Sequence, residues 1–159
     1  MRVVPKRRAP RWLSVEAVRA LHAEQVEVFG GEAGLLNPNS LEAALARPQN
    51  AFVYGRTTDL AGLAAIYLVG LARAHAFVDG NKRLGLAAAL VFLALNGRPL
   101  HVPPVDLYDL TMRVAMGRAR EAWVTTWLRK RMGTRGHCRA HNASGPESTP
   151  EYRPAIADS

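Results

Sequence analysis

The chain has little cysteine and no long apolar run: Cys138 is the only cysteine in 159 residues. A single cysteine cannot close an internal disulfide, which argues against a disulfide-stapled secreted domain and favours a reducing cytoplasm. The most apolar stretch, residues 84–95, is too short to span a bilayer and predicts a buried helix. The basic N-terminus leads into an amphipathic pattern rather than a signal-peptide core. We therefore expect a cytoplasmic protein with no membrane partner.

Acidic residues are outnumbered, 13 against 21 lysines and arginines, for a net charge of +8. Residues 1–11 hold five basic residues and no acidic ones, and residues 129–159 hold six and three. Residues 12–128 hold ten of each, so the body of the protein is neutral. A nucleic-acid-binding fold usually carries a basic stripe on its folded surface. Direct nucleic-acid binding is therefore not expected, except through the basic tails.

A hydrophobic content of 48% over this length predicts one globular domain. We place it at residues 12–132, between a basic N-terminal tail (1–11) and a C-terminal tail (133–159). The C-terminal tail is rich in Gly, Ser, Pro, Arg and Ala without an apolar period, which predicts disorder. Its three possible metal ligands make a weak candidate site: His137, Cys138 and His141.

Apolar residues recur with a period near 3.6 through most of the domain, which predicts an all-α fold. We expect helices at residues 15–29, capped by Ser14; from Asn39 or Ser40 to before Pro48; at 60–74, capped by Asp59; at 81–95; after Asp106; and around Trp123, Trp127 and Leu128.

Residues 49–58 are expected to be irregular. Phe52, Val53 and Tyr54 favour a strand there, so the fold has at most one short β-hairpin, a flap.

Residues 75–83 combine polar and flexible residues of functional type between two apolar helices. Because histidine exchanges a proton near neutral pH, His75 is a candidate general base. Phe77 would pin the segment to the core. Asp79 offers a hard oxygen ligand suited to Mg²⁺, and Gly80 permits a turn that other residues resist.

Asn81, Lys82 and Arg83 open the following helix. Basic residues in a first turn oppose the helix dipole, which makes sense if an anion is bound there. Together with the free N–H groups of the helix start, they would form a phosphate nest. A base, a metal ligand and a phosphate nest indicate phosphoryl or nucleotidyl transfer. The structural alternative is that Asp79 or Asn81 simply caps the helix.

These residues resemble the signature of Fic-domain proteins, His-x-Phe-x-(Asp/Glu)-Gly-Asn-(Gly/Lys)-Arg, with every defining position filled. The resemblance covers about residues 12–132 and implies a compact helical bundle. Fic proteins that transfer AMP usually have glycine where Lys82 stands and arginine where Leu86 stands. Both departures match the Doc branch of toxins.

The Doc resemblance implies a kinase toxin that transfers the γ-phosphate of ATP to a hydroxyl of elongation factor Tu and so inhibits translation. It implies that His75 takes the proton of that hydroxyl and that Asp79 holds Mg²⁺. The ATP phosphates would be held by Gly80, Asn81, Lys82 and Arg83. The alternative within the family is an AMP-transferase that modifies a protein hydroxyl.

The resemblance also implies partners. The chain has no Ser/Thr-x-x-x-Glu-Gly/Asn stretch, which forms the internal inhibitory helix of some Fic proteins. An antitoxin acting in trans is then expected, with a C-terminal segment that folds on the toxin. Residues 49–58 match the place of the Fic flap, which lays out the target chain. Outside the family, a nucleic-acid-binding or RNA-cleaving toxin and a non-catalytic scaffold remain as alternatives.

Overall fold

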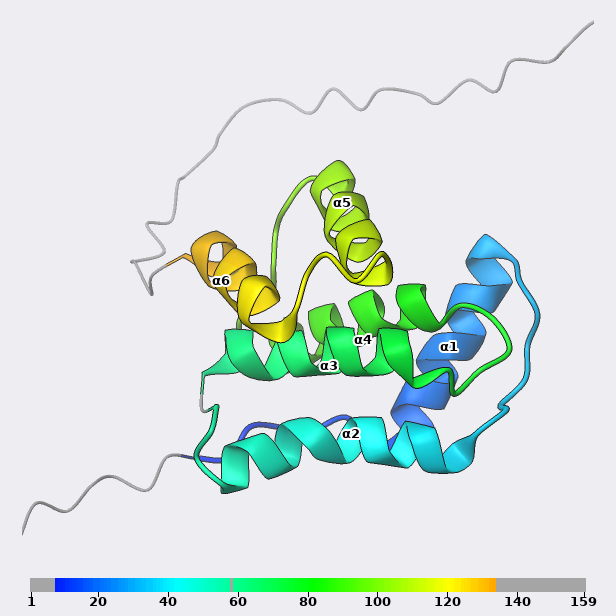
Figure 1. Ribbon diagram of the computed structural model, residues 1–159, viewed down its shortest axis with the longest axis horizontal. Coiled ribbons are helices and arrows are strands. Elements are labelled where there is room, and N and C mark those ends of the chain that lie inside the picture. The colour runs from blue at the N-terminus through cyan, green and yellow to red at the C-terminus, as the bar shows by residue number, and fades with distance from the viewer. Residues whose placement is uncertain (1–7, 58, 134–159) are drawn as a thin grey trace, which may run out of the picture.

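The computed structural model describes residues 8–57 and 59–133, and Figure 1 shows them as a bundle of helices. This confirms the all-α prediction, since the strand-like contact found in these residues is an isolated antiparallel bridge between Leu35 and Phe77. The helices are α1 (Val15–Phe29), α2 (Pro38–Val53), α3 (Leu60–Ala74), α4 (Asn81–Leu95), α5 (Pro104–Ala115) and α6 (Glu121–Met132).

Helix α3 lies at the centre of the bundle. All residues from 61 to 72 are buried, as expected for a helix that is hydrophobic on every side. It contacts α2, α4, α5 and α6. In Figure 1, α2 lies along one side of α3, and α5 and α6 lie on the opposite side. The packing around α3 therefore holds its C-terminal end in place, and with it the start of the connection to α4.

Helices α3 and α4 approach each other backbone to backbone. A Cβ atom on Gly85 would lie 2.6 Å from the carbonyl oxygen of Leu68, closer than real Cβ contacts allow. Glycine at this position therefore sets the separation of the two helices. This separation also sets the position of the connection between them, where the predicted functional residues lie.

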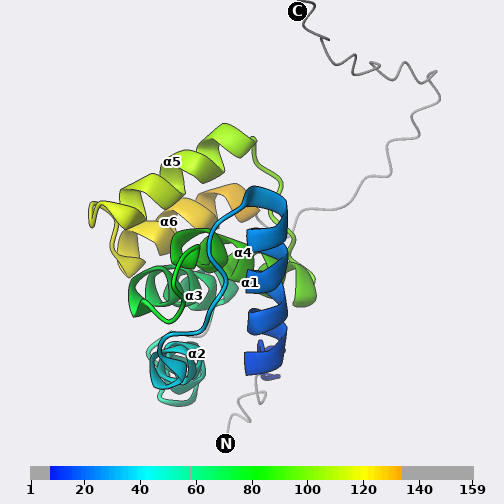
Figure 2. The same cartoon turned by 90° about the vertical axis from the view of Figure 1, so that its right-hand side faces the viewer.

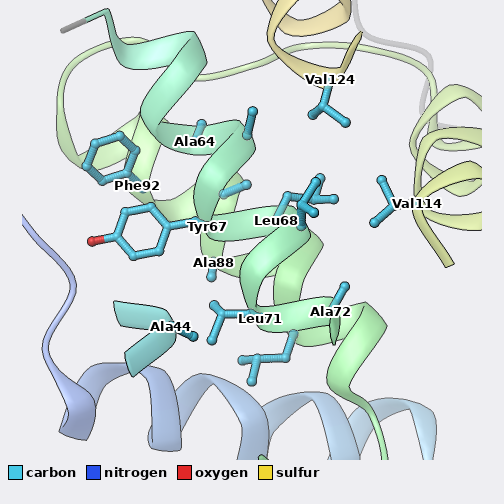
Figure 3. Close-up of a cluster of buried hydrophobic side chains, with 14 of the residues drawn as sticks. Ala44, Ala64, Tyr67, Leu68, Leu71, Ala72, Ala88, Phe92, Val114 and Val124 are labelled. Carbon is cyan, nitrogen blue, oxygen red and sulfur yellow. The ribbon is translucent and has the colours of Figure 1, made fainter. Parts of the chain in front are cut away.

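Tyr67 of α3 is one of the large, fully buried side chains of the core. Its ring centroid lies 4.9 Å from that of Phe92 on α4, and Figure 3 shows the two rings side by side. The hydroxyl accepts a hydrogen bond from the Leu13 amide at 3.2 Å. Burial raises the pKa of Tyr67, an effect that this hydrogen bond partly offsets. Val114 of α5 and Val124 of α6 complete the core from the far side.

Helix α1 begins as predicted, with the Ser14 hydroxyl accepting a hydrogen bond from the Ala17 amide at 3.1 Å. It packs against α4 (Figure 2), with Val18 and His22 buried. Phe29, the last residue of the helix, does not join the core. Its side chain is 64% exposed, and the guanidinium group of Arg83 lies 5.7 Å from its ring centroid.

The predicted limits of α2 are wrong at both ends. Asn37 caps the helix, accepting a hydrogen bond from the Ser40 amide at 3.1 Å, and Pro38 occupies the first turn. The helix does not stop before Pro48 but continues to Val53. Proline costs a helix about 3 kcal/mol. The buried face extends through this position, so burial offsets that cost: Leu41, Ala44, Leu45, Pro48 and Ala51.

The prediction that residues 49–58 are irregular is also wrong for residues 49–53, and no hairpin forms there. Phe52 and Val53 form the last turn of α2, and Tyr54 ends it. No strand occurs in the described part of residues 49–57. The apolar triplet was misleading because Val53 and Tyr54 are both 75% exposed and pair with no neighbouring strand.

The last two helices follow the prediction more loosely. Helix α5 starts at Pro104, two residues before the expected cap Asp106. In α6 the buried residues are Val124 and Leu128. Trp127 packs partly against the core, whereas Trp123 is 40% exposed beneath the guanidinium group of Arg113.

His101 lies exposed on the loop between α4 and α5. The two predicted tails, and with them His137, Cys138 and His141, fall largely outside the described residues. Among the residues that the structure describes, no helix has the length and hydropathy needed to cross a membrane.

Candidate active site

His75 ends α3 in an unusual backbone conformation. Its φ and ψ angles of 48° and 38° are left-handed, and it is the one described residue other than glycine with a positive φ. Such a conformation costs on the order of 1 kcal/mol and is common at functional sites, where the surrounding structure maintains it. The side chain is exposed and lines a cavity. The central helix thus presents a candidate base at its end.

Two aromatic rings anchor the loop that follows. Phe77 is 4% exposed, and its ring stacks on that of His22 with centroids 3.8 Å apart and planes 16° apart. His22 Nε2 lies 2.7 Å from the backbone oxygen of Asp79. The sequence predicted that Phe77 pins the loop. His22 supports it from α1, because its ring stacks on Phe77 and its Nε2 contacts the backbone of Asp79 two residues further on.

Asn81 closes the loop from inside. Its side-chain amide donates to the Phe77 carbonyl at 2.9 Å and accepts from the Phe77 amide at 3.1 Å. Both ends of the Asn81 side chain are therefore engaged with the backbone. This residue contributes a backbone N–H to the helix start, while its side chain keeps the loop closed.

Residues 34–37 brace the loop from outside. Two amides of this segment, those of Leu36 and Asn37, donate to the Ala76 carbonyl at 2.8 and 3.0 Å. In return, the Val78 amide donates to the Gly34 carbonyl at 3.0 Å. The loop is therefore held by backbone hydrogen bonds on one side and by side chains on the other.

The start of α4 offers unused hydrogen-bond donors. Gly80 precedes the helix with φ 78°, and no side chain caps it. Within the described residues, the amides of Asn81, Lys82 and Arg83 have no backbone or side-chain acceptor, as is usual for a first helical turn. Three N–H groups that point out of a helix start form an anion site. The alternative that Asp79 or Asn81 merely caps this helix is wrong, because neither side chain bonds to these amides.

Asp79 lies beside this anion site. Its Oδ1 accepts a hydrogen bond from the Gly80 amide at 2.6 Å. The carboxylate is exposed and makes no ion pair in the part of the chain that the structure describes. Gly31, in the loop after α1, leaves room for it, since a Cβ atom on Gly31 would lie 2.5 Å from Oδ2.

Two cations complete the helix start. Arg83 donates from Nη2 to the Gly30 carbonyl at 2.9 Å, which fixes its guanidinium group against the loop after α1. Lys82 is exposed and forms no ion pair within residues 8–57 and 59–133. Positive side chains at the positive end of a helix dipole are unfavourable alone and become favourable with a bound anion.

All six residues predicted from the sequence line one cavity of about 470 Å³: His75, Asp79, Gly80, Asn81, Lys82 and Arg83. Its opposite wall comes from α5, with Tyr108, Thr111 and Met112. No pattern in the sequence predicted this wall. None predicted the contacts of His22 and Gly31 with the loop either, since both residues lie more than 40 positions from it.

The residues present fit a magnesium ion only in company with phosphates. The described residues contain no group of three or more His, Cys, Asp or Glu side chains that could hold a metal alone. Magnesium is usually bound through one or two carboxylates together with substrate phosphates and water. Asp79, unpaired and next to the phosphate-binding amides, meets that requirement.

Comparisons with known proteins agree with this arrangement. The model of the Fic/DOC family matches residues 12–93. The chain is 39% identical over 124 residues to Protein kinase doc of Escherichia phage P1, covering 78% of this chain and 98% of that protein. It is 52% identical over 71 residues to Toxin Doc of Mycolicibacterium smegmatis, covering 43% of this chain and 54% of that protein. The chain therefore belongs to the Fic/DOC family.

Proposed function

We propose that the protein is a Doc-type kinase toxin that transfers the γ-phosphate of ATP to a hydroxyl of a translation protein, with elongation factor Tu as the first candidate. The observation that carries the proposal is the single cavity that unites His75, an unpaired Asp79 and the unused amides of α4. The 39% identity to a protein named Protein kinase doc, over most of the chain, supports a Doc-type kinase.

His75 acts as the general base. The hydroxyl oxygen of the target forms the new bond to the γ-phosphorus while its proton passes to the imidazole, and the bond from that phosphorus to the bridging oxygen breaks to release ADP. The exposed position of His75 at the rim of the cavity leaves it accessible to a protein side chain. Its left-handed backbone is held by the loop, so the imidazole needs little rearrangement before reaction.

Lys82, Arg83 and the first amides of α4 bind the phosphates and offset the charge that develops during transfer. Asp79 would hold the magnesium ion that accompanies ATP. ATP would supply the transferable phosphoryl group, and the ion would neutralise part of its charge. Arg83, fixed on the Gly30 carbonyl, is positioned before the nucleotide arrives.

The rival reaction is transfer of AMP. Against it stand Lys82, where that branch usually has glycine, and Leu86, where it usually has arginine. Leu86 packs against the core, so this position offers no charge to a distal phosphate.

Labelled ATP separates the two reactions. Purified protein is incubated with elongation factor Tu and ATP labelled at the α or the γ phosphate. We expect label on the acceptor from the γ position alone, and we expect His75→Ala to reduce the rate by about 10²–10⁴-fold. Label from the α position alone would establish AMP transfer. The matched control is His101→Ala, which removes an exposed histidine that does not line the cavity and should leave the rate unchanged.

An antitoxin is the expected partner of such a toxin, and one of the relatives is named Toxin Doc. We propose that its C-terminal segment folds on this chain and blocks the reaction. Coexpression with the product of the adjacent reading frame should restore growth of cells that the wild-type toxin arrests. Growth arrest that persists beside every neighbouring product would count against this partner.

A further inference from the structure

A second cavity lies on the other side of the last turn of α3. It has a volume of about 870 Å³ and is lined by residues of α2, α3 and the start of α6. Figure 1 shows α2 and α6 on opposite sides of α3. Three arginines line it, one from each helix or its cap: Arg47, Arg73 and Arg120. Small side chains such as Ala43, Gly70 and Ala122 form the depression between them.

A smaller cavity adjoins this one. The smaller cavity, about 190 Å³, shares the ion-paired Arg47 and Glu121 with the first and adds Arg56. We call the two together the arginine groove. It runs along α2 and α3, from the residues that precede His75 to the connection that follows α2.

The arginine groove concentrates positive charge on an otherwise neutral body. Residues 12–128 contain ten basic and ten acidic residues, of which four basic and one acidic line the groove. The acidic one, Glu121, forms an ion pair with Arg47. Arg73 and Arg120 form no ion pair, and their side chains make no hydrogen bond, within the described residues. Such unpaired arginines are favourable for binding an anionic partner.

The arginine groove lies next to the cavity that holds His75. Ala72 and His75 line the catalytic cavity, whereas Arg73 and Ala74 line the groove. The last turn of α3 is therefore a wall shared by both cavities. A chain lying in the groove could place a neighbouring residue over this wall and next to His75.

The lining decides which anionic polymer fits. Proteins that bind single-stranded nucleic acid usually combine cations with aromatic side chains on which the bases stack. No aromatic residue lines either part of the groove. Arginines separated by small aliphatic surfaces suit the carboxylates of an acidic peptide instead.

We propose that the arginine groove binds an acidic segment of the protein substrate and so directs a hydroxyl near that segment to His75. The proposal rests on the proposed transfer of phosphate to a protein. Charge complementarity of this kind mainly raises the association rate and orients the bound segment, and both effects weaken as the salt concentration rises.

The test compares two full-length variants that have the same net charge. Arg73→Glu/Arg120→Glu reverses the two unpaired charges of the groove. Arg19→Glu/Lys130→Glu reverses two exposed charges elsewhere, on α1 and α6, and keeps both tails intact. The probe is a fluorescein-labelled peptide of ten glutamates, followed by fluorescence anisotropy. We expect the groove variant to bind the peptide at least about tenfold more weakly than the control variant, with the difference shrinking in high salt.

Equal binding by both variants would assign the peptide to the basic tails and overturn the proposal, as would a wild-type protein that does not bind the peptide. A ten-nucleotide RNA that binds more tightly than the peptide, and loses binding in the groove variant, would overturn it in favour of nucleic acid. Thermal unfolding of both variants shows whether they fold.

A second measurement separates this proposal from the kinase assignment. For phosphorylation of elongation factor Tu, the groove variant should raise KM for the protein about tenfold while leaving ATP affinity unchanged. If the wild-type protein transfers no phosphate to elongation factor Tu, the assignment of this protein as its kinase fails. The peptide measurement alone then decides whether the groove binds acidic segments.

Discussion

The two connections on either end of α3 are built in opposite ways. The connection to α4, residues 75–80, is held by Asn81 from within, by His22 from α1 and by residues 34–37 from outside. The connection from α2, residues 54–57, is held mainly by its own backbone, with the amides of residues 56 and 57 bonded to the carbonyl of Ala51. Its large side chain, Tyr54, is 75% exposed.

This difference shows what the geometry of residues 75–80 requires. Its bracing residues come from three separate parts of the chain, so its geometry depends on the whole fold. The strain at His75 is maintained by that bracing. Residues 54–57 make no such long-range hydrogen bonds within the described residues, so they can change with little consequence elsewhere. Substitutions in the two connections should therefore have very different costs.

The largest effect is expected for Asn81→Ala. The change leaves the partly buried amide and carbonyl of Phe77 without their partner, which costs about 1–3 kcal/mol. It should lower the melting temperature and reduce phosphate transfer by more than about tenfold, because the loop no longer holds its shape. Asn39→Ala, on the exposed start of α2, is the matched control and should change neither value. An active and stable Asn81→Ala protein would show that the Asn81–Phe77 hydrogen bonds do not hold the loop in shape.

Gly31→Ala should displace Asp79, although the two residues are far apart in the sequence. Its Cβ would lie 2.5 Å from Asp79 Oδ2, so the carboxylate must move. We expect transfer to fall about tenfold and the magnesium concentration for half-maximal rate to rise.

Gly30→Ala provides a close control for that change. Gly30 also has a positive φ, 75° against 121° for Gly31, but its Cβ would meet nothing within 4 Å. It should cost about 1 kcal/mol of stability from backbone strain and leave the magnesium dependence unchanged. Equal magnesium dependence in both variants would show that Gly31 matters through its backbone alone.

His22→Phe sharpens the comparison further. Phenylalanine keeps an aromatic ring against Phe77 but removes the hydrogen bond to the Asp79 carbonyl. Loss of one such bond, about 1 kcal/mol, corresponds to a roughly fivefold change in the balance between loop conformations. We expect kcat to fall several-fold with ATP affinity nearly unchanged, and His22→Ala to cost more stability because the stacking is lost too. If kcat is unchanged while only stability falls, His22 has no positioning role.

The sequence predicted the parts of this molecule that depend on neighbours along the chain. The period of the apolar residues located α3 and α4 correctly, and the residues of the loop were all found to share one cavity. Pro48 misled the prediction of α2, because local propensity opposes a helix there and burial of the helix face overrides it.

The long-range supports could not be predicted in the same way. Neither His22 nor Gly31 shows its purpose in its own surroundings, since each acts on a loop more than 40 residues away. The wall that α5 contributes is hidden for the same reason. Predicting these contacts requires knowing how the helices pack.

The smallest effect is expected where α2 ends and the other connection begins, for the double substitution Val53→Ser/Tyr54→Ser. Both side chains are 75% exposed, and the Tyr54 hydroxyl makes no hydrogen bond within the described residues. Exposed substitutions of this kind usually change stability by no more than about 0.5 kcal/mol. Thermal unfolding should therefore be nearly unchanged, in contrast to Asn81→Ala.

The kinetic result of that double substitution decides what this connection is for. Although it forms no hairpin, it occupies the place where the sequence predicted a flap that contacts the target. If it is a passive connection, KM for elongation factor Tu stays the same. A several-fold rise in that KM with unchanged kcat and ATP affinity would instead show that exposed Val53 and Tyr54 contact the protein substrate, and that the lightly held connection has a binding role of its own.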